Sequence, residues 1–325
     1  MKAAVRTRYG PPDVLTIQHV EAPVPGDADV LVEVHATTVN RTDCGYLRGL
    51  PRVGRLAYGI RGPKHPILGN EFAGRVVAIG AEVGSYAVGD DVFGYNEGTM
   101  GAHAEYMTVR ANGMMARMPD GLSYEAAAPT AEGAHYALGI LRKAHVGPGT
   151  RMMVYGATGA IGSATVQLAK HLGADVTAVC GTDHIELVQS LGPDRVIDYM
   201  KEDFTTGDGN YDFVFDAVGK SAFGTCKGLL KPGGIYCSSD VGPRWENPFL
   251  ALWTPRFGEK KVMFPIPRTS REDMEYLKRL VETGAFTPVI DRTYPLDRIV
   301  EAFTYVETGM KVGNVVITVR DGQDA

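Results

Sequence analysis

The chain has 325 residues with a formal net charge of −5, and 44% of its residues are hydrophobic. This length predicts two domains, and the hydrophobic share is ordinary for a globular protein with buried cores. Because positive and negative residues are interspersed, the chain has no global field for nucleic acid or an anionic membrane, so we expect neither as a partner. These features favour an enzyme that acts on small molecules.

The four cysteines, Cys44, Cys180, Cys226 and Cys237, include no CxxC pair. The sequence therefore lacks the pattern of a zinc knuckle or a dithiol redox motif, and we expect reduced, buried thiols. The first residues contain no apolar core of signal-peptide length, and no window approaches the roughly 20 apolar residues of a membrane span. We expect a cytoplasmic protein.

Residues 1–120 consist of short apolar runs broken by glycine and proline, which is typical of an all-β domain. We expect a partly closed barrel with strands at 30–34, 73–79 and 104–109. After Leu122 the pattern changes, and Ser123 followed by Glu125 resembles a capped helix start.

From there, strands and helices alternate, which predicts a doubly wound parallel sheet with helices on both faces. Strands are expected at 152–155, 175–180, 195–198, 211–216 and 234–239, and helices at 131–144, 160–172, 184–191 and 221–230. An aromatic, proline-rich stretch at 243–270 reads as a long loop, and a helix follows at 270–283. Because the tail at 313–319 reads as a strand like those of the first half, we assign residues 1–122 and 290–325 to one domain and 123–289 to the other.

A glycine-rich turn follows the first strand of the α/β domain, at Gly156-Ala157-Thr158-Gly159-Ala160-Ile161-Gly162. Such a turn presents backbone N–H groups and the positive end of a helix to a pyrophosphate. Gly159 allows a close backbone approach, and Gly162 allows the helix to pack tightly on the sheet. A tight turn without a ligand is the alternative, but the repeated strand–helix units favour a bound nicotinamide dinucleotide.

The end of the second strand bears on the choice between NADP and NAD, because an acid there holds the ribose hydroxyls of NAD. Here the strand ends Cys180-Gly181-Thr182, without an acid, which favours NADPH over NADH. Asp183 argues against a bound phosphate, and His184 is the nearest possible cation. Tyr199, after the third strand, is either a contact of the adenosine end or a surface tyrosine.

At several segments the sequence resembles the medium-chain dehydrogenase/reductase superfamily, in its zinc-independent quinone oxidoreductase-like branch. The resemblance implies a GroES-like catalytic domain and a Rossmann domain. The matching segments are Met1-Lys2-Ala3 with Tyr9-Gly10, Val39-Asn40-Arg41-Thr42-Asp43, Gly69-Asn70-Glu71-Phe72-Ala73-Gly74, Val88-Gly89-Asp90-Asp91-Val92-Phe93-Gly94, the glycine turn, Val196-Ile197-Asp198-Tyr199, Phe215-Asp216-Ala217-Val218-Gly219, Leu230-Lys231-Pro232-Gly233-Gly234 and Gly313-Asn314-Val315-Val316.

The resemblance also bears on zinc. Zinc-type relatives have a cysteine where this chain has Asn40, a histidine where it has Asn70, and a third ligand near Thr130 and Ala131. Catalytic zinc needs three His, Cys or carboxylate ligands, and Asp43 with Glu71 is a poor zinc pair. We therefore expect no zinc, and we interpret the Asn70 side chain as a hydrogen-bonding group of its loop.

Hydride transfer without a Lewis acid requires an acceptor that is already activated, such as a quinone or an α,β-unsaturated carbonyl. By resemblance, Asn40 and Asp43 lie at the substrate site, and Tyr46 is either a hydroxyl donor to the substrate or a packing residue. Thr130 is the fourth implied catalytic residue and would sit near the nicotinamide. The remaining implied cofactor contacts are Ala217, Val218, Gly219, Ser238, Gly313 and Asn314.

These features predict a zinc-independent, NADPH-dependent reductase of quinones or enones. A metal-free alcohol or carbonyl dehydrogenase and a non-catalytic NADP(H)-binding sensor are the alternatives. We expect a homodimer in which the strand at 234–239 is the sheet edge that pairs with a second subunit. The stretch from Pro243 to Pro267 is expected to shape a pocket for an apolar or planar substrate.

Overall fold

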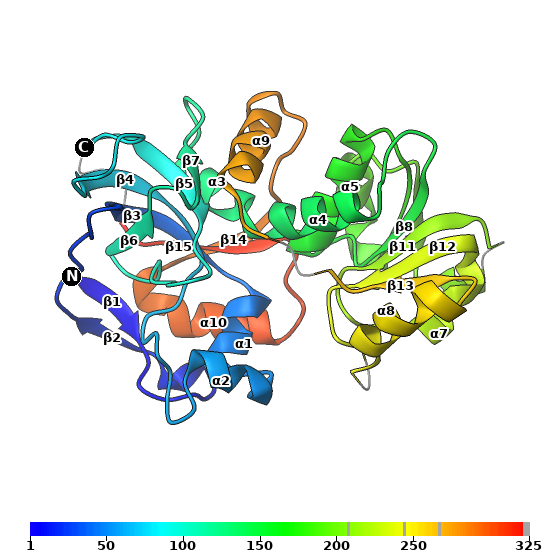
Figure 1. Cartoon of the computed structure of the whole chain (residues 1–325), viewed down its shortest axis with the longest axis horizontal. Coiled ribbons are helices and arrows are strands. Elements are labelled where there is room, and N and C mark those ends of the chain that lie inside the picture. The colour runs from blue at the N-terminus through cyan, green and yellow to red at the C-terminus, as the bar shows by residue number, and fades with distance from the viewer. Residues whose placement is uncertain (207–208, 243–244, 266–267, 321–325) are drawn as a thin grey trace. The chain divides into compact units, whose positions relative to one another are not determined.

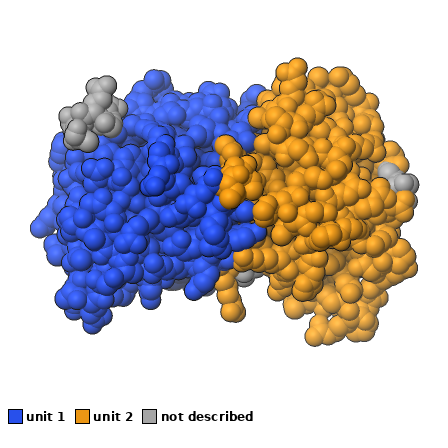
Figure 2. All heavy atoms as spheres, turned by 90° about the horizontal axis from the view of Figure 1, so that it is seen from above, with its two compact units in different colours: residues 1–132, 269–282, 288–325 blue, residues 133–268, 283–287 orange. Residues whose placement is uncertain are grey.

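We analysed a computed structural model of the chain, which describes residues 1–206, 209–242, 245–265 and 268–320. The chain divides into two compact units (Figure 2). Unit 1 comprises residues 1–132, 269–282 and 288–325, and unit 2 comprises residues 133–268 and 283–287. Within the described ranges, every helix is too short or too polar to cross a membrane.

Unit 1 is built on a curved, mainly antiparallel sheet (Figure 1). Its strand order is β14-β15-β3-β4-β5-β7, β6 pairs with β3, and β1 pairs with β2 in a separate ribbon. The long strand β3 is central because it pairs with β4, β6 and β15. The strands are β1 (Lys2–Val5), β2 (Thr16–His19), β3 (Asp29–Val39), β4 (Glu71–Ile79), β5 (Asp91–Tyr95), β6 (Tyr106–Arg110), β7 (Met114–Arg117), β14 (Ile290–Pro295) and β15 (Asn314–Thr318).

The expectation of an all-β first half is wrong, because two helices follow β3 (Figure 1). Helix α1 (Arg41–Arg48) follows the N-cap residue Asn40, whose backbone N–H donates to the Asp43 side chain, and it ends at Gly49 in the left-handed conformation. The single turn α2 (Arg55–Tyr58) comes next. The other helices of this unit are α3 (Tyr124–Ala127), α9 (Arg271–Glu282) and α10 (Ile299–Glu307).

The predicted cap at Ser123 is confirmed, because its hydroxyl accepts a hydrogen bond from the Ala126 N–H. Helix α10 packs its apolar face, including Ile299 and Phe303, into a core shared with α1 and β15. The region that follows β3 is therefore held by packing against the C-terminal part of the chain.

Unit 2 contains a parallel six-stranded sheet in the order β10-β9-β8-β11-β12-β13. Its strands are β8 (Arg151–Tyr155), β9 (Asp175–Cys180), β10 (Arg195–Asp198), β11 (Tyr211–Asp216), β12 (Leu230–Ser238) and β13 (Lys261–Met263). Its helices are α4 (Glu132–Lys143), whose first residue belongs to unit 1, α5 (Ala160–His171), α6 (Ile185–Ser190), α7 (Phe223–Cys226) and α8 (Glu246–Phe257). The predicted alternation is confirmed, and the reversal of strand order at β8 and β11 is the topological switch point of such folds.

Two expectations for this unit are wrong. Much of the predicted loop at 243–270 is ordered as α8 and β13, although Pro243 and Pro267 lie outside the described residues. Strand β12 is not the sheet edge, because β13 pairs with its outer side through Ile235, Tyr236 and Cys237. The edge of the sheet is therefore β13.

Candidate functional site

A polar cluster lies where three strands of unit 1 meet. Asn40 follows β3, Glu71 begins β4 and Asn314 begins β15. The antiparallel registers pair Thr37 with Phe72 and Val39 with Val315. The end of β3 and the starts of β4 and β15 therefore lie next to one another. Asn40, Glu71 and Asn314 are all buried.

The Glu71 carboxylate is the centre of this cluster. One oxygen, Oε2, accepts hydrogen bonds from Thr38 Oγ1 at 2.6 Å and Asn40 Nδ2 at 2.8 Å. The other, Oε1, accepts the backbone N–H groups of Ala131 at 3.1 Å and Glu132 at 2.6 Å. Four donors therefore satisfy a fully buried carboxylate, which is what burial of such a group requires.

Glu132 and Asp43 complete the cluster. Glu132 accepts hydrogen bonds from the Thr42 hydroxyl and, at 3.3 Å, from the Asn40 amide. Asp43 accepts the Asn40 backbone N–H at 2.8 Å, so its observed contact is that of a helix cap. Asn40 thus joins the two glutamates, although they are far apart in sequence.

Burial raises the pKa of Glu71, and the nearby Glu132 carboxyl raises it further. Burial also raises the pKa of Asp43 and of Glu132. Lys311 lies in the field of these acids: burial lowers the pKa of its ammonium, while Glu132 and Glu71 favour the charged form. Burial therefore penalises charge on all three acids, while the hydrogen bonds to Glu71 and Glu132 favour it, and one cation, Lys311, lies beside them.

Tyr46, on α1, is buried, and its hydroxyl donates to Glu97 Oε1 at 3.2 Å. Burial and the Glu97 carboxylate raise its pKa, so the hydroxyl keeps its proton. Its ring stands edge-on to Tyr58 of α2 at 4.7 Å between centroids. Thr130 is fully buried, and its hydroxyl donates to the Ala126 carbonyl at 3.4 Å.

Several buried polar atoms in this region have no hydrogen-bond partner among the described residues. They include Asn40 Oδ1, Asn314 Oδ1 and both side-chain polar atoms of Asn70. The expectation that the Asn70 side chain bonds within its loop is therefore wrong, since only its backbone carbonyl is engaged, by Asn96. Unpaired buried acceptors of this kind suit a ligand that brings N–H donors.

Unit 2 contains the predicted cofactor turn, between β8 and α5. Gly156 has a φ of +82°, and the N–H groups of Gly156 and Ala157 both donate to Val179 of β9. A Cβ on Gly162 would lie 2.0 Å from the Gly156 carbonyl oxygen, so only glycine fits there. Gly159 is the N-cap of α5 and supplies no side-chain cap. The first N–H groups of α5 therefore have no intrahelical partner and suit a pyrophosphate.

The strand ends beside this turn bring the predicted residues Thr182 and Tyr199 close to Asp198 and Lys201, which the sequence prediction did not assign. Thr182, after β9, donates its hydroxyl to Asp198 at the end of β10, at 2.7 Å. Asp198 also lies 3.3 Å from Lys201 Nζ, an exposed cation. Tyr199 is partly exposed, and its hydroxyl oxygen lies 3.3 Å from where a Cβ of Gly181 would be. The buried Cys180 supplies only backbone here, as acceptor for Tyr199.

Asp216, at the end of β11, was also not assigned. Its buried carboxylate accepts the backbone N–H groups of Val218, Gly219 and Ser221 at 2.8–3.1 Å, which fixes the loop after Ala217. Ser238, at the end of β12, accepts the Asp240 N–H. An acid at a parallel strand end was the signal in the sequence that would have found Asp198 and Asp216.

Comparisons with known proteins match this two-part architecture. Residues 26–120 match the family described as alcohol dehydrogenase GroES-like domain, and residues 191–317 match the family described as zinc-binding dehydrogenase. The 2-methylene-furan-3-one reductase of Solanum lycopersicum is 32% identical over 98% of this chain and 79% of its own length. The chain belongs to the medium-chain dehydrogenase/reductase superfamily.

Two further members of the superfamily are similar to this chain. The NADPH-dependent alkenal/one oxidoreductase of Arabidopsis thaliana is 30% identical over 98% of this chain and 79% of its own length. The structure of the quinone oxidoreductase from Coxiella burnetii superposes with a TM-score of 0.88 at 26% identity, covering 98% of this chain and 99% of that one. The predicted fold class, the oxidoreductase class and a nicotinamide cofactor are thereby confirmed. Among the described residues, no three His, Cys, Asp or Glu side chains are grouped to hold a metal.

Replacing Gly162 with alanine should damage cofactor binding, because the added Cβ would overlap the Gly156 carbonyl. We expect a loss of stability of about 1–3 kcal/mol, typical of overpacking, and at least about a tenfold weaker affinity for NADPH in a fluorescence titration. Gly224→Ala is the control, because a Cβ there meets open space. An unchanged NADPH affinity in Gly162→Ala would contradict the assignment of this turn.

Replacing Glu71 with glutamine should flatten the dependence of stability on pH. Because the folded-state pKa of Glu71 is raised, its contribution is fully present at acid pH and is lost as pH rises above the ordinary carboxyl range. Between about pH 5.5 and about pH 8.5, wild type should lose about 1 kcal/mol more free energy of unfolding than Glu71→Gln. Urea unfolding measures this, with the exposed Glu82→Gln as control; equal losses in all three proteins would refute it.

Proposed function

We propose that this chain is a zinc-independent reductase that uses NADPH to reduce a quinone or an α,β-unsaturated carbonyl. The main support for the proposal is the hydrogen bonding of Glu71. Its two carboxylate oxygens accept hydrogen bonds from four donors. Asn40, at a ligand position of zinc-type relatives, is one of those donors and directs its amide hydrogens at carboxylates. These two side chains are thus engaged with each other.

The cofactor is held by residues of unit 2. The N–H groups at the start of α5, after Gly156–Gly162, would bind the pyrophosphate, and the loop 217–219 with Ser238 would continue the site. When bound, the reduced nicotinamide supplies a hydride. The unpaired acceptors Asn40 Oδ1 and Asn314 Oδ1 are suited to N–H donors of a ligand.

Reduction of an enone adds one hydride to the β-carbon and one proton to the resulting enolate. We assign the proton to Tyr46, because its hydroxyl carries a proton and is positioned by its hydrogen bond to Glu97; a proton from solvent would restore the hydroxyl after each turnover. Asp43 and Thr130 would then act through positioning, since Asp43 caps α1 and Thr130 is bonded within its own turn.

The preference for NADPH is supported by the strand end Cys180-Gly181-Thr182, which has no acid, and by the exposed cation Lys201; His184 is a second possible partner for a phosphate. Asp183 and Asp198 oppose it. Lys201 partly neutralises Asp198 at 3.3 Å, and Thr182 occupies one oxygen of the same carboxylate. We also propose that the protein has two domains, one of residues 1–122 and 290–325 and the other of residues 123–289, and that it is cytoplasmic.

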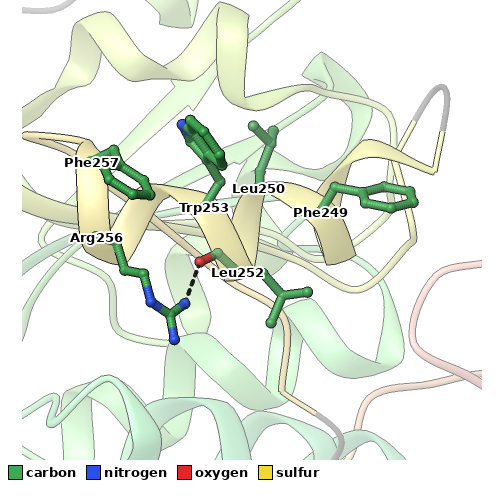
Figure 3. A pocket seen from close by; sticks show the side chains of 6 residues that line it. All are labelled: Phe249, Leu250, Leu252, Trp253, Arg256 and Phe257. Atoms are coloured by element: carbon green, nitrogen blue, oxygen red, sulfur yellow. Dashed lines mark hydrogen bonds between the residues drawn. The ribbon is translucent and has the colours of Figure 1, made fainter.

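A homodimer is supported by the outer surface of unit 2. Helix α8 turns Leu250 and Ala251 to the core and leaves Phe249, Leu252, Trp253 and Phe257 exposed. These side chains line a groove of about 500 Å³ (Figure 3). Helix α8 packs on the edge strand β13. An exposed apolar face beside an unpaired edge favours a second copy of the chain.

The enzymatic proposal predicts that NADPH oxidation, followed by absorbance, requires a quinone or enone and continues in the presence of a chelator. Tyr46→Phe should lower kcat about 100-fold, the usual effect of removing a general acid. Tyr86→Phe is the matched control, because it removes a hydroxyl of similar burial that donates to the Met115 carbonyl. Loss of turnover on chelation with recovery on adding zinc would refute metal independence, and no turnover with any acceptor would refute the reaction.

The dimer proposal predicts a solution mass of two chains by light scattering at micromolar concentration. Trp253→Asp should yield one chain, because it buries a charge in the contact. Val88→Asp, at an exposed valine of unit 1, should leave the dimer intact. A wild-type mass of one chain would overturn the assignment.

A further inference from the structure

The segment between Cys44 and Asn70 carries an unusual charge distribution. It contains Arg48, Arg52, Arg55, Arg61 and Lys64 and not one aspartate or glutamate, although the whole chain has a net charge of −5. The acids nearest in sequence, Asp43 and Glu71, are buried in the polar cluster. The segment is therefore a local basic region on an acidic protein.

Some of its side chains hold the segment onto unit 1. Arg55 Nε donates to the Gly49 carbonyl at 3.0 Å, and its guanidinium lies 4.6 Å from the Tyr9 ring centroid. Tyr9 in turn donates its hydroxyl to the Gly59 carbonyl at 2.9 Å. Tyr58 packs edge-on against Tyr46, and Arg48 forms an ion pair with Glu307. These contacts fix one side of α2.

Other side chains of the segment are exposed, and they include both apolar and cationic ones. Leu56 and Ile60 are each 70% exposed, and Val53 is 57% exposed. Arg52, Arg61 and Lys64 are also exposed and form no ion pair with any described residue. We name these six residues the basic apolar surface.

We infer that the basic apolar surface binds the tail of an amphiphilic substrate, an enone whose apolar chain ends in an anionic group. Val53, Leu56 and Ile60 would contact the chain, and the three cations would bind the anion. The inference rests on the proposed function, because Tyr58, which belongs to the same segment, packs against Tyr46, the assigned proton donor. Figure 1 shows α1 and α2 side by side in unit 1.

The test compares two enones with the same reactive head and the same chain length, one ending in a methyl group and one in a carboxylate. Wild type should show about tenfold higher kcat/KM for the anionic enone at low salt, as expected for a substrate attracted by several charges. The ratio should fall towards one as NaCl is raised from roughly 20 mM to roughly 500 mM, because salt screens exposed charges.

The triple variant R52E, R61E and K64E should reverse the preference, while kcat/KM for the neutral enone stays within about twofold of wild type. The matched control R110E, K143E and R298E makes the same change of net charge at exposed cations outside the segment, and it should keep the wild-type ratio. Leu56→Ser with Ile60→Ser should reduce the advantage of long chains over short ones for both enones.

The inference is overturned if wild type treats the two enones equally at low salt, or if both triple variants change the ratio alike. Should the first triple variant fail to fold, the salt dependence of wild type decides alone. Sedimentation with phosphatidylglycerol vesicles, without any preference between the enones, would assign the surface to lipid and reject the inference. Failure to reduce the neutral enone would instead count against the proposed function.

Discussion

The hydrogen bonds of one buried carboxylate determine how unit 1 is assembled around its candidate site. Glu71, at the start of β4, binds the end of β3 through Thr38 and Asn40 and the backbone of residues 131 and 132. Without it, the buried N–H groups of residues 131 and 132 would lose this acceptor, at a cost of about 1–3 kcal/mol for each donor left unpaired. The position of Asn40, and through it the start of α1, therefore depends on Glu71.

Asn40, which stands at a ligand position of zinc-type relatives, therefore also helps to determine the geometry of the candidate site. Asn40 begins the helix that carries Tyr46, and it links Glu71 to Glu132. A histidine or cysteine at this place would lack the two amide hydrogens that satisfy those carboxylates. Asn40 is therefore adapted to a network of hydrogen-bonded acids, and the proposed reaction draws its proton instead from a hydroxyl, that of Tyr46.

The sequence predicted what local patterns encode and missed what distant contacts decide. The strands of unit 2 and the turn at Gly156–Gly162 follow from alternation and glycine spacing. Helix α8 was missed because its pattern is inverted: Asn247 and Thr254 are buried, while Phe249 and Trp253 face outwards, so no apolar face marks it as a helix. The role of Glu71 depends on donors some 60 residues away in sequence, which no local pattern contains.

Net charge gave a similarly incomplete account of the surface. The value of −5 correctly describes a chain without a global field, yet acids and bases are separated around α1. Asp43 at its first turn and Arg48 at its last suit the helix dipole. After Arg48 the chain contains only cationic charged residues until Glu71. Because the acids are withdrawn into hydrogen bonds, the exposed cations of this segment are not neutralised by neighbours in sequence.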